Sequence, residues 1–226
     1  MRFKDVFSII GPSMIGPSSS HTAGAVRLGR AARQLFGSQP RKAEATFFGS
    51  FADTYRGHGT DVAVAAGLLD MDTDDERIAD AMRLAEEAKL DYVIRTGSGA
   101  ATHPNTLSLA LSAGRKRLSM TGCSIGGGNI EIVEVNGFDL KFTGNYPTLV
   151  VYHGDRPGML AELTGLLGEA GINIGHMDLD RKGRRGEAAT VIESDAAIAT
   201  GLRRRIRALP DVRGTGYMDL NGGEGA

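Results

Sequence analysis

The order of strands and helices predicted for the last third of the chain allows few folds. Short apolar runs predict four strands, at residues 148–153, 172–179, 187–193 and 211–218. Leucine and isoleucine at helical spacing predict two helices, at residues 157–169 and 196–209. The order β-α-β-β-α-β, over residues 147–220, is that of a ferredoxin-like domain. Residues 221–226 are expected to form a flexible tail.

Residues 1–145 predict a separate domain of mixed helices and strands, with the boundary at Asn145–Pro147. Six strands are predicted, at residues 43–51, 92–96, 106–112, 116–123, 129–135 and 138–143. Three helices are predicted, at residues 21–36, 58–69 and 74–89. Asn136-Gly137 between two of the strands indicates an antiparallel hairpin. Because strands outnumber helices and the hairpin is antiparallel, the predicted fold class is α+β.

Charge and hydropathy exclude several classes of protein. Lys and Arg number 26 against 27 Asp and Glu, so the chain has no global basic field for nucleic acid. The basic clusters at residues 181–185 and 203–207 lack interleaved aromatic residues, which favours a solvated face or a contact with a partner chain. Residues 1–10 contain no long apolar run, so we expect neither a secretory signal nor a membrane anchor, and a cytoplasmic location.

A polar segment near the N-terminus precedes a predicted helix. Two Gly-Pro pairs lead into three hydroxyls, a histidine and a fourth hydroxyl: Ser18, Ser19, Ser20, His21 and Thr22. Ser20 or a neighbouring residue is expected to cap the helix, and the remaining hydroxyls and backbone N–H groups would bind a small anion at its N-terminus. His21, at the same end, is the candidate for proton transfer near neutral pH.

Two further histidines lie among glycine, threonine and proline. His58 and Thr60 belong to Gly57-His58-Gly59-Thr60-Asp61, just before a helix, whereas His103, Asn105 and Thr106 belong to a segment just before a strand. Each segment is suited to turn backbone and hydroxyl groups toward a ligand. The sequence alone does not determine whether the three histidines converge.

Other common chemistries are absent from the sequence. There is no phosphate-binding Gly-Lys-Ser/Thr loop and no His-Glu-x-x-His zinc helix. Cys123 is the single cysteine, which excludes an internal disulfide and a metal site made only of this chain's cysteines. We therefore assign no metal ligand to this chain and expect Cys123 to be a small buried residue.

The loop before the first helix of the C-terminal domain resembles that of ACT domains. It reads His153-Gly154-Asp155-Arg156-Pro157-Gly158-Met159-Leu160, and Asn173-Ile174 matches the start of the second strand of that family. Asp155 is suited to cap the helix, and Gly158 would let a carboxylate approach its N-terminus. The resemblance implies self-association and an amino-acid effector site, for which the candidates are Asp155, Pro157, Gly158 and Asn173.

The chain as a whole resembles the β chain of the two-subunit, iron–sulfur-dependent L-serine dehydratases. The matching segments are Gly16–Gly24, Gly57–Asp61 and His103–Thr106, in that order and followed by the ACT-like domain. The resemblance implies an L-serine ammonia-lyase subunit that forms pyruvate and ammonia. It also implies a 4Fe-4S cluster, held by cysteines of a partner α chain because one thiol is too few.

Two alternatives are open at this point. A free-standing amino-acid-binding regulator with an ACT domain would need no partner and no catalysis. A detached regulatory segment of a 3-phosphoglycerate dehydrogenase is the second, because the N-terminal region is also similar to the substrate-binding-type domain of some of those enzymes. It does not explain the three histidine segments together.

Overall fold

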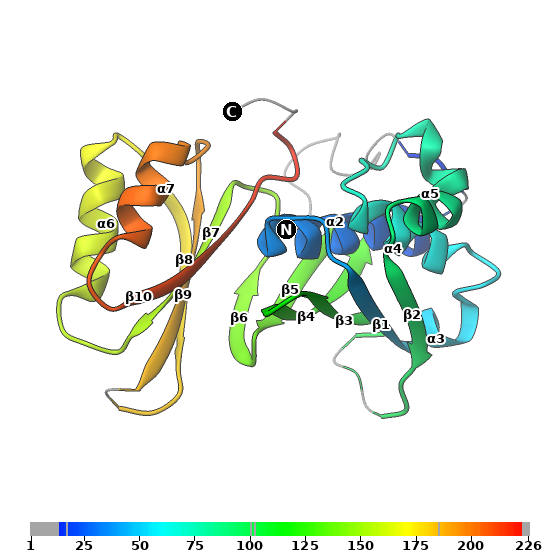
Figure 1. Ribbon diagram of the computed structural model, residues 1–226, viewed down its shortest axis with the longest axis horizontal. Coiled ribbons are helices and arrows are strands. Elements are labelled where there is room, and N and C mark those ends of the chain that lie inside the picture. The colour runs from blue at the N-terminus through cyan, green and yellow to red at the C-terminus, as the bar shows by residue number, and fades with distance from the viewer. Residues whose placement is uncertain (1–13, 17, 100, 102, 185, 223–226) are drawn as a thin grey trace. The chain divides into compact units, whose positions relative to one another are not determined.

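The computed structural model describes residues 14–16, 18–99, 101, 103–184 and 186–222. It divides into two compact units, residues 1–136 and 137–226 (Figure 1). The predicted segments Gly11–Ser13 and Pro17 lie outside the described residues, as do residues 223–226 of the predicted tail. None of the described helices is long and apolar enough to cross a membrane.

In the first unit, helices pack on one face of a sheet whose strands from this unit follow the order β2-β1-β3-β4-β5. The strands are β1 (Lys42–Gly49), β2 (Asp91–Thr96), β3 (Asn105–Ala113), β4 (Lys116–Gly126) and β5 (Asn129–Val135). The helical elements are the π-helical turn η1 (Ser19–Ala23), α2 (Gly24–Phe36), α3 (Ser50–Thr54), α4 (Thr60–Leu68), the 3-10 turn η2 (Glu76–Asp80) and α5 (Ala81–Glu87). Among the described strands of this unit, β1 and β2 pair in parallel and the other pairs are antiparallel, so the α+β prediction is confirmed.

Two helices of this unit touch through their backbones. A Cβ atom on Gly67 of α4 would lie 2.1 Å from the carbonyl oxygen of Val26, and one on Gly29 of α2 would lie 2.6 Å from that of Val64. Because no side chain separates the helices here, α4 packs close against α2, with Val26 and Val64 fully buried. This contact joins the first turns of α2 to the C-terminal half of α4.

The second unit contains β6 (Phe138–Phe142), β7 (Thr148–Gly154), α6 (Met159–Glu169), β8 (Ile174–Arg181), β9 (Glu187–Ser194), α7 (Thr200–Arg207) and β10 (Val212–Met218). The sheet order β10-β7-β9-β8 is that of the predicted ferredoxin-like βαββαβ domain, which is confirmed. Its core joins sheet residues such as Leu149 and Ile192 to Leu163 of α6 and Ile206 of α7.

The division between the units falls ahead of the predicted boundary at 145–147. β6 lies against β8 and β9, and three carboxylates of those strands accept backbone N–H groups from it and from the following turn. Asp180 accepts from Asp139 at 3.0 Å, Asp178 from Lys141 at 3.0 Å and the buried Glu193 from Thr143 at 3.1 Å. These bonds tie β6 and the turn after it to β8 and β9.

Several element ends differ from the prediction for local reasons. The strand predicted at 43–51 ends at Gly49, whose positive φ of 54° turns the chain into α3. Gly59 (φ 63°) delays α4 to Thr60, and Gly158 (φ 86°) delays α6 to Met159. The helix predicted at 74–89 consists of η2 followed by α5. Asn136 and Gly137 both have positive φ, as the predicted two-residue turn requires.

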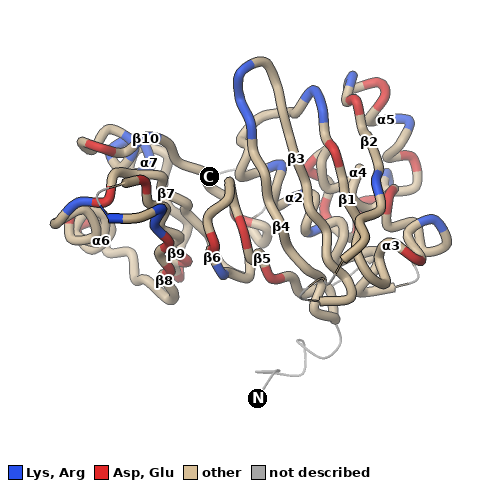
Figure 2. The backbone as a smooth tube through the Cα atoms, turned by 90° about the horizontal axis from the view of Figure 1, so that it is seen from below, with Lys and Arg blue, Asp and Glu red and all other residues tan. Residues whose placement is uncertain are grey.

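Basic and acidic residues are interleaved in both units (Figure 2). Arg181, from the first basic cluster, pairs with Asp155 at 3.4 Å, and Arg205, from the second, pairs with Glu169 at 3.2 Å. The basic clusters are thus partly neutralised within the chain.

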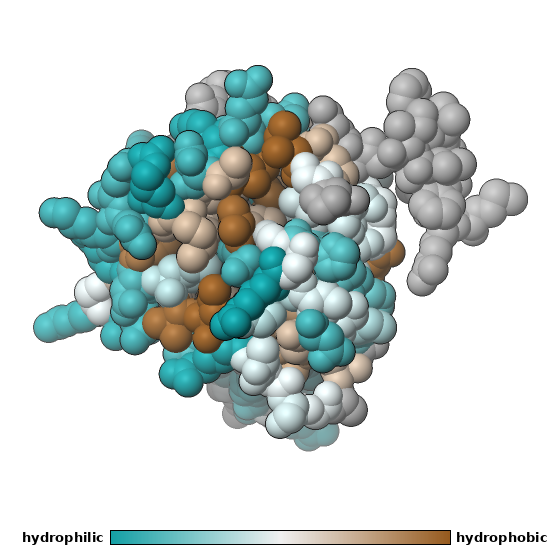
Figure 3. Space-filling model, turned by 90° about the vertical axis from the view of Figure 1, so that its right-hand side faces the viewer, coloured by the Kyte–Doolittle hydropathy of each residue, from teal (hydrophilic) through white to brown (hydrophobic). Residues whose placement is uncertain are grey.

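On the side of the first unit that carries α3, α5 and β2, apolar residues form small patches between hydrophilic ones (Figure 3).

Candidate functional site

The end of β1 and the start of β3 bring two of the predicted segments together. Gly49 and Asn105 are partners in the antiparallel β1–β3 register. The backbone N–H of Phe51 donates to the carbonyl oxygen of Pro104 at 3.4 Å, and a Cβ on Gly49 would lie 2.6 Å from that oxygen. Glycine at position 49 therefore lets the 103–106 segment lie directly beside the start of α3.

His21 lies on η1, just before α2, and is held by two serine hydroxyls. Ser18 is the N-cap, and its Oγ accepts the backbone N–H of His21 at 3.1 Å while lying 3.4 Å from Nδ1 of the ring. Nε2 of the same ring lies 3.2 Å from Oγ of Ser50, the first residue of α3. The His21 imidazole thus joins the N-terminal motif to the turn after β1.

His58 completes a pair of histidines. The rings of His21 and His58 have centroids 4.8 Å apart, and the buried Phe51 ring packs edge-on against His21 at 5.3 Å. His58 is exposed and His21 is half-buried. One face of His21 is therefore anchored in the unit, whereas its neighbour His58 is open to solvent.

Three hydroxyls in this region are buried and have no hydrogen-bond partner among the described residues: Thr22, Thr60 and Ser124. Thr22 lies beneath Gly16, whose φ of 120° and lack of a side chain allow the close approach. Ser124 of β4 lies against Gly24, where a Cβ would be 2.1 Å from its Oγ. Because buried polar groups normally have partners, these hydroxyls are the groups of this region that are free to hydrogen-bond a ligand or water.

The 103–106 segment is fixed by its own hydrogen bonds. The ring Nδ1 of His103 accepts the backbone N–H of Asn105 at 3.1 Å, and the Thr106 hydroxyl donates to the carbonyl oxygen of His103 at 2.6 Å. The Asn105 side chain donates to the carbonyl oxygen of Ser124 at 3.5 Å. His103 and Asn105 are half-buried, whereas Thr106 is buried.

The structure thus brings the predicted residues together through two sets of contacts, one direct and one indirect. Ser18, His21 and His58 are linked through direct contacts, and the 103–106 segment joins them through Gly49, Ser50 and Phe51. Ser19 and Ser20 are half-buried in the first turn of η1. Thr22 and Thr60 are buried, so their hydroxyls can bond only to a group that enters the interior of the first unit.

Sequence reasoning missed Ser50 and Ser124. Ser50 was assigned to a strand, and Ser124 follows a strand that was predicted to end at Cys123. The signal that would have identified Ser50 is Gly49 at the end of an apolar run, because a glycine there often marks a sharp turn. Ser124 carries no comparable signal.

Burial, the larger cause, and the neighbouring His58 imidazole both lower the pKa of His21 below its ordinary value of 6.5. The ring is therefore neutral at pH 7 and able to accept a proton. Because the unfolded chain protonates first as the pH falls, the contribution of His21 to stability is present above pH 6.5. It is lost as the pH falls from 6.5 through the folded-state pKa.

Replacing His58 with alanine is expected to raise the pKa of His21 toward 6.5 without reaching it, because burial is the larger cause and remains. An NMR titration of the imidazole resonances of the full chain measures both values. His176→Ala is the matched control, because His176 lies in the other unit and its Nε2 donates to the Lys141 carbonyl oxygen. A His21 pKa of 6.5 or higher in the wild type, or no change in His58→Ala, contradicts this account.

The N-terminal end of η1 and α2 is suited to a carboxylate. The first turn of a helix has backbone N–H groups without intrahelical partners, and the helix dipole is positive at that end. Neither η1 nor the first turn of α2 contains an acidic residue to compete for that position. A carboxylate ligand would lie there beside Ser18–Ser20 and the neutral His21.

The chain's residues do not fit an iron–sulfur cluster. Its single cysteine, Cys123, is buried, and its Sγ donates to the carbonyl oxygen of Glu131 at 3.7 Å. Among the described residues, no group of three or more His, Cys, Asp or Glu side chains is arranged to hold a metal ion. A cluster needs several thiolates, so this chain cannot supply them.

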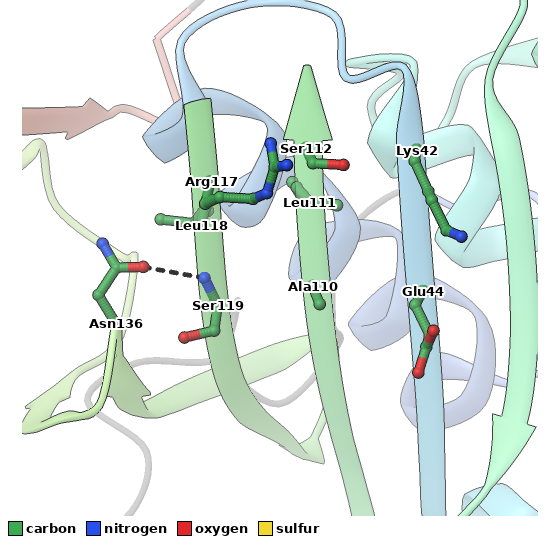
Figure 4. A pocket seen from close by; sticks show the side chains of 9 residues that line it. All are labelled: Lys42, Glu44, Ala110, Leu111, Ser112, Arg117, Leu118, Ser119 and Asn136. Carbon is green, nitrogen blue, oxygen red and sulfur yellow. Dashed lines mark hydrogen bonds between the residues drawn. The ribbon is translucent and has the colours of Figure 1, made fainter. Parts of the chain in front are cut away.

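A hollow of about 490 Å³ lies on the sheet at the opposite end of β1 from Gly49 (Figure 4). Its charged groups are already engaged. Lys42 lies 3.7 Å from the Asp91 carboxylate, Glu44 accepts from Arg95 at 2.8 Å, and Arg117 donates to the carbonyl oxygen of Gly114 at 2.6 Å. None of these residues belongs to the predicted site, and we assign no ligand to this hollow.

In the second unit, the predicted effector residues have partners within the chain. Asp155 does not cap α6 as predicted: Gly158 is the N-cap residue and no side chain bonds there, while the Asp155 carboxylate pairs with Arg181. Asn173 donates to the carboxylate of Asp195 at 2.7 Å. The cap prediction is wrong because α6 begins at Met159 with Gly158 as its N-cap residue, so Asp155 lies ahead of the capping position. Pro157 and Gly158 are exposed in this loop.

Comparison with known families agrees with this architecture. The model of the serine dehydratase beta chain matches residues 3–98, which include η1, α3 and α4, and the model of the ACT domain matches residues 148–211. The class of protein is therefore a serine dehydratase beta-type domain joined to an ACT domain.

Curated relatives extend the similarity along nearly the whole chain. A probable L-serine dehydratase beta chain of Bacillus subtilis is 48% identical over 94% of this chain and 96% of its own length. The L-serine dehydratase beta chain of Peptoniphilus asaccharolyticus is 32% identical over 95% of this chain and 97% of its own. The chain belongs to the L-serine dehydratase beta chain family. A D-3-phosphoglycerate dehydrogenase of Methanocaldococcus jannaschii is 24% identical over 57% of this chain but only 24% of its own length.

Proposed function

We propose that this chain is the β subunit of an L-serine dehydratase, which converts L-serine to pyruvate and ammonia together with a cysteine-bearing α chain. The observation that carries the proposal is the match to two beta chains over nearly their full lengths. A free-standing regulator would not need the three histidine segments. A segment of phosphoglycerate dehydrogenase would explain only a quarter of that enzyme's length.

We assign a separate role to each of the two domains of the chain. Residues 1–145 form the serine dehydratase β-type domain that binds the substrate, residues 147–220 form the ACT domain, and residues 221–226 form a tail. A 4Fe-4S cluster is held by thiolates of the α chain, since Cys123 is the only thiol here. A cytoplasmic location suits such thiolates, because the cytosol keeps them reduced.

In the substrate-binding domain, the carboxylate of L-serine binds at the N-terminal end of η1 and α2, beside Ser18, Ser19 and Ser20. His21 is the catalytic residue: its neutral imidazole accepts a proton, and the imidazolium formed in that step returns it. The lower-ranked members of the pocket are Thr22, His58, Thr60, His103, Asn105 and Thr106. The bond from the Phe51 N–H to the Pro104 carbonyl oxygen holds the 103–106 segment beside Ser50.

The experiment is an anaerobic reconstitution. The purified chain, the purified α chain and their mixture are each supplied with L-serine, and pyruvate is measured. Pyruvate is expected only from the mixture, in proportion to the complex formed. Dehydration of L-serine by this chain alone, without partner or iron, overturns the proposal.

We also propose that the ACT domain mediates self-association through β8, an edge strand of its sheet. Met177 and Leu179 of β8 are each 40% exposed, and they lie on the same face because they are two residues apart. Exposed apolar side chains on an edge strand favour pairing with a second copy. L-serine is the candidate effector, near Asp155, Pro157, Gly158 and Asn173.

Changing both Met177 and Leu179 to lysine is expected to convert the full-length chain from a dimer to a monomer. The charges oppose pairing of two copies of β8, and light scattering over a range of concentrations with and without L-serine measures the change. Met82→Lys is the matched control, because Met82 of α5 is similarly exposed at 38%. A chain that is monomeric at every concentration, or a double variant that remains dimeric, contradicts the proposal.

A further inference from the structure

Ser50 has a fixed position that the sequence did not reveal. It begins α3 directly after Gly49, whose φ of 54° and ψ of −132° turn the chain sharply. Phe51, the next residue, is fully buried and packs edge-on against Phe47 at 6.1 Å. A glycine turn on one side and a buried ring on the other leave the Ser50 side chain little freedom.

A further hydrogen bond holds the carbonyl side of the same residue. The Thr54 hydroxyl donates to the carbonyl oxygen of Ser50 at 2.6 Å. The N–H of Phe51 is bound by Pro104 of the 103–106 segment. Ser50 is therefore held directly by Thr54 of α3 and, through its neighbour Phe51, by the segment before β3.

The hydroxyl of Ser50 is the closer of the two that contact the His21 ring. Its Oγ lies 3.2 Å from Nε2, whereas Ser18 Oγ lies 3.4 Å from Nδ1 and already accepts the backbone N–H of His21. A neutral imidazole has one N–H donor and one acceptor nitrogen, and its hydrogen-bond partners decide which is which. Phe51 and His58 contact the His21 ring through their own rings.

We propose that Ser50 is a positioning residue, whose hydroxyl donates to Nε2 of His21, so that the ring proton lies on Nδ1 and the imidazole is fixed in one tautomer and one orientation. Ser50 acts through His21 and does not touch the substrate. The catalytic consequence rests on the proposed function, whereas the tautomer is a property of this chain alone. The two are therefore separable by experiment.

The first measurement uses the full chain without its partner. Long-range ¹H–¹⁵N NMR of the imidazoles reports the tautomer of His21 in the wild type, Ser50→Ala and Ser50→Thr. The wild type and Ser50→Thr, which keeps a hydroxyl, are expected to show one tautomer, and Ser50→Ala a mixture. Ser108→Ala is the control, because Ser108 bonds Thr121 in the same unit and lies outside the site. An unchanged His21 tautomer in Ser50→Ala overturns the proposal.

The second measurement uses the complex with the α chain. Ser50→Ala is expected to lower kcat about two- to tenfold, the effect of one hydrogen bond between uncharged groups, with a smaller change in KM. Ser50→Thr is expected to recover most of that loss. A changed tautomer with kcat unaltered overturns the positioning role. If no complex of any variant, the wild type included, dehydrates L-serine, the proposed function fails while the tautomer result still decides the role of Ser50.

Discussion

Replacing His21 with alanine is expected to lower the turnover of the assembled enzyme about 10²- to 10⁴-fold, the range for loss of a general acid or base. The imidazole is neutral, anchored by two serine hydroxyls and placed beside the helix end that suits a carboxylate. The variant is expected to assemble with the α chain and keep the cluster absorbance, because the proposed cluster is held by thiolates of the α chain. Steady-state kinetics and the visible spectrum measure the two properties separately.

His103→Gln is a useful comparison for that experiment. The His103 ring accepts a backbone N–H within its own segment, so its loss is expected to disturb the pocket without removing the proton carrier. His176→Ala, in the other unit, is the neutral control. Full turnover and unchanged L-serine affinity in His21→Ala would mean that the N-terminal motif is only a helix cap.

Replacing Gly67 with alanine is expected to destabilise the first unit by about 3 kcal/mol, the upper part of the usual range for overpacking. The new methyl group would lie 2.1 Å from the carbonyl oxygen of Val26 and 2.6 Å from the backbone nitrogen of Arg30, so α2 and α4 must separate. Such a loss is a large part of the roughly 5–15 kcal/mol that stabilises a domain. Urea unfolding and amide exchange in α2 and α4 measure it.

Gly165→Ala is the matched control for Gly67→Ala. Gly165 lies within α6 and is exposed, and a Cβ there would meet nothing within 4 Å. The substitution is expected to stabilise the chain by roughly 0.5–1 kcal/mol, because alanine loses less backbone entropy than glycine in a helix. Equal effects of the two substitutions would contradict the proposed backbone contact between α2 and α4.

The ferredoxin-like unit was predictable because its strands and helices are regular and its apolar periodicity is strong. Elements that depend on a single glycine conformation were less predictable. Gly49 ends β1 and creates α3, and Gly158 shifts the start of α6 away from Asp155. Glycine in a sequence permits a positive φ but does not require one, so neither boundary could be derived from local pattern alone.

The candidate site likewise combines features that a local sequence pattern predicts with features that it does not predict. The polar motif around His21 and its cap by a serine were predicted from residue type. The contact between His21 and Ser50 spans 29 residues and depends on the packing of η1 against the start of α3, which no local pattern specifies. The buried hydroxyl of Ser124 likewise becomes a neighbour of α2 only after β4 packs beneath that helix.

The division of labour between two chains is the central claim, and iron and inorganic sulfide analysis tests it most directly. The measurement compares this chain alone, the complex with the α chain, and the complex carrying Cys123→Ser. We predict no iron or sulfide in the lone chain, and the same iron, sulfide and L-serine turnover in the Cys123→Ser complex as in the wild-type complex. A cluster on the lone chain, or iron lost from the Cys123→Ser complex while it remains assembled, would contradict the account.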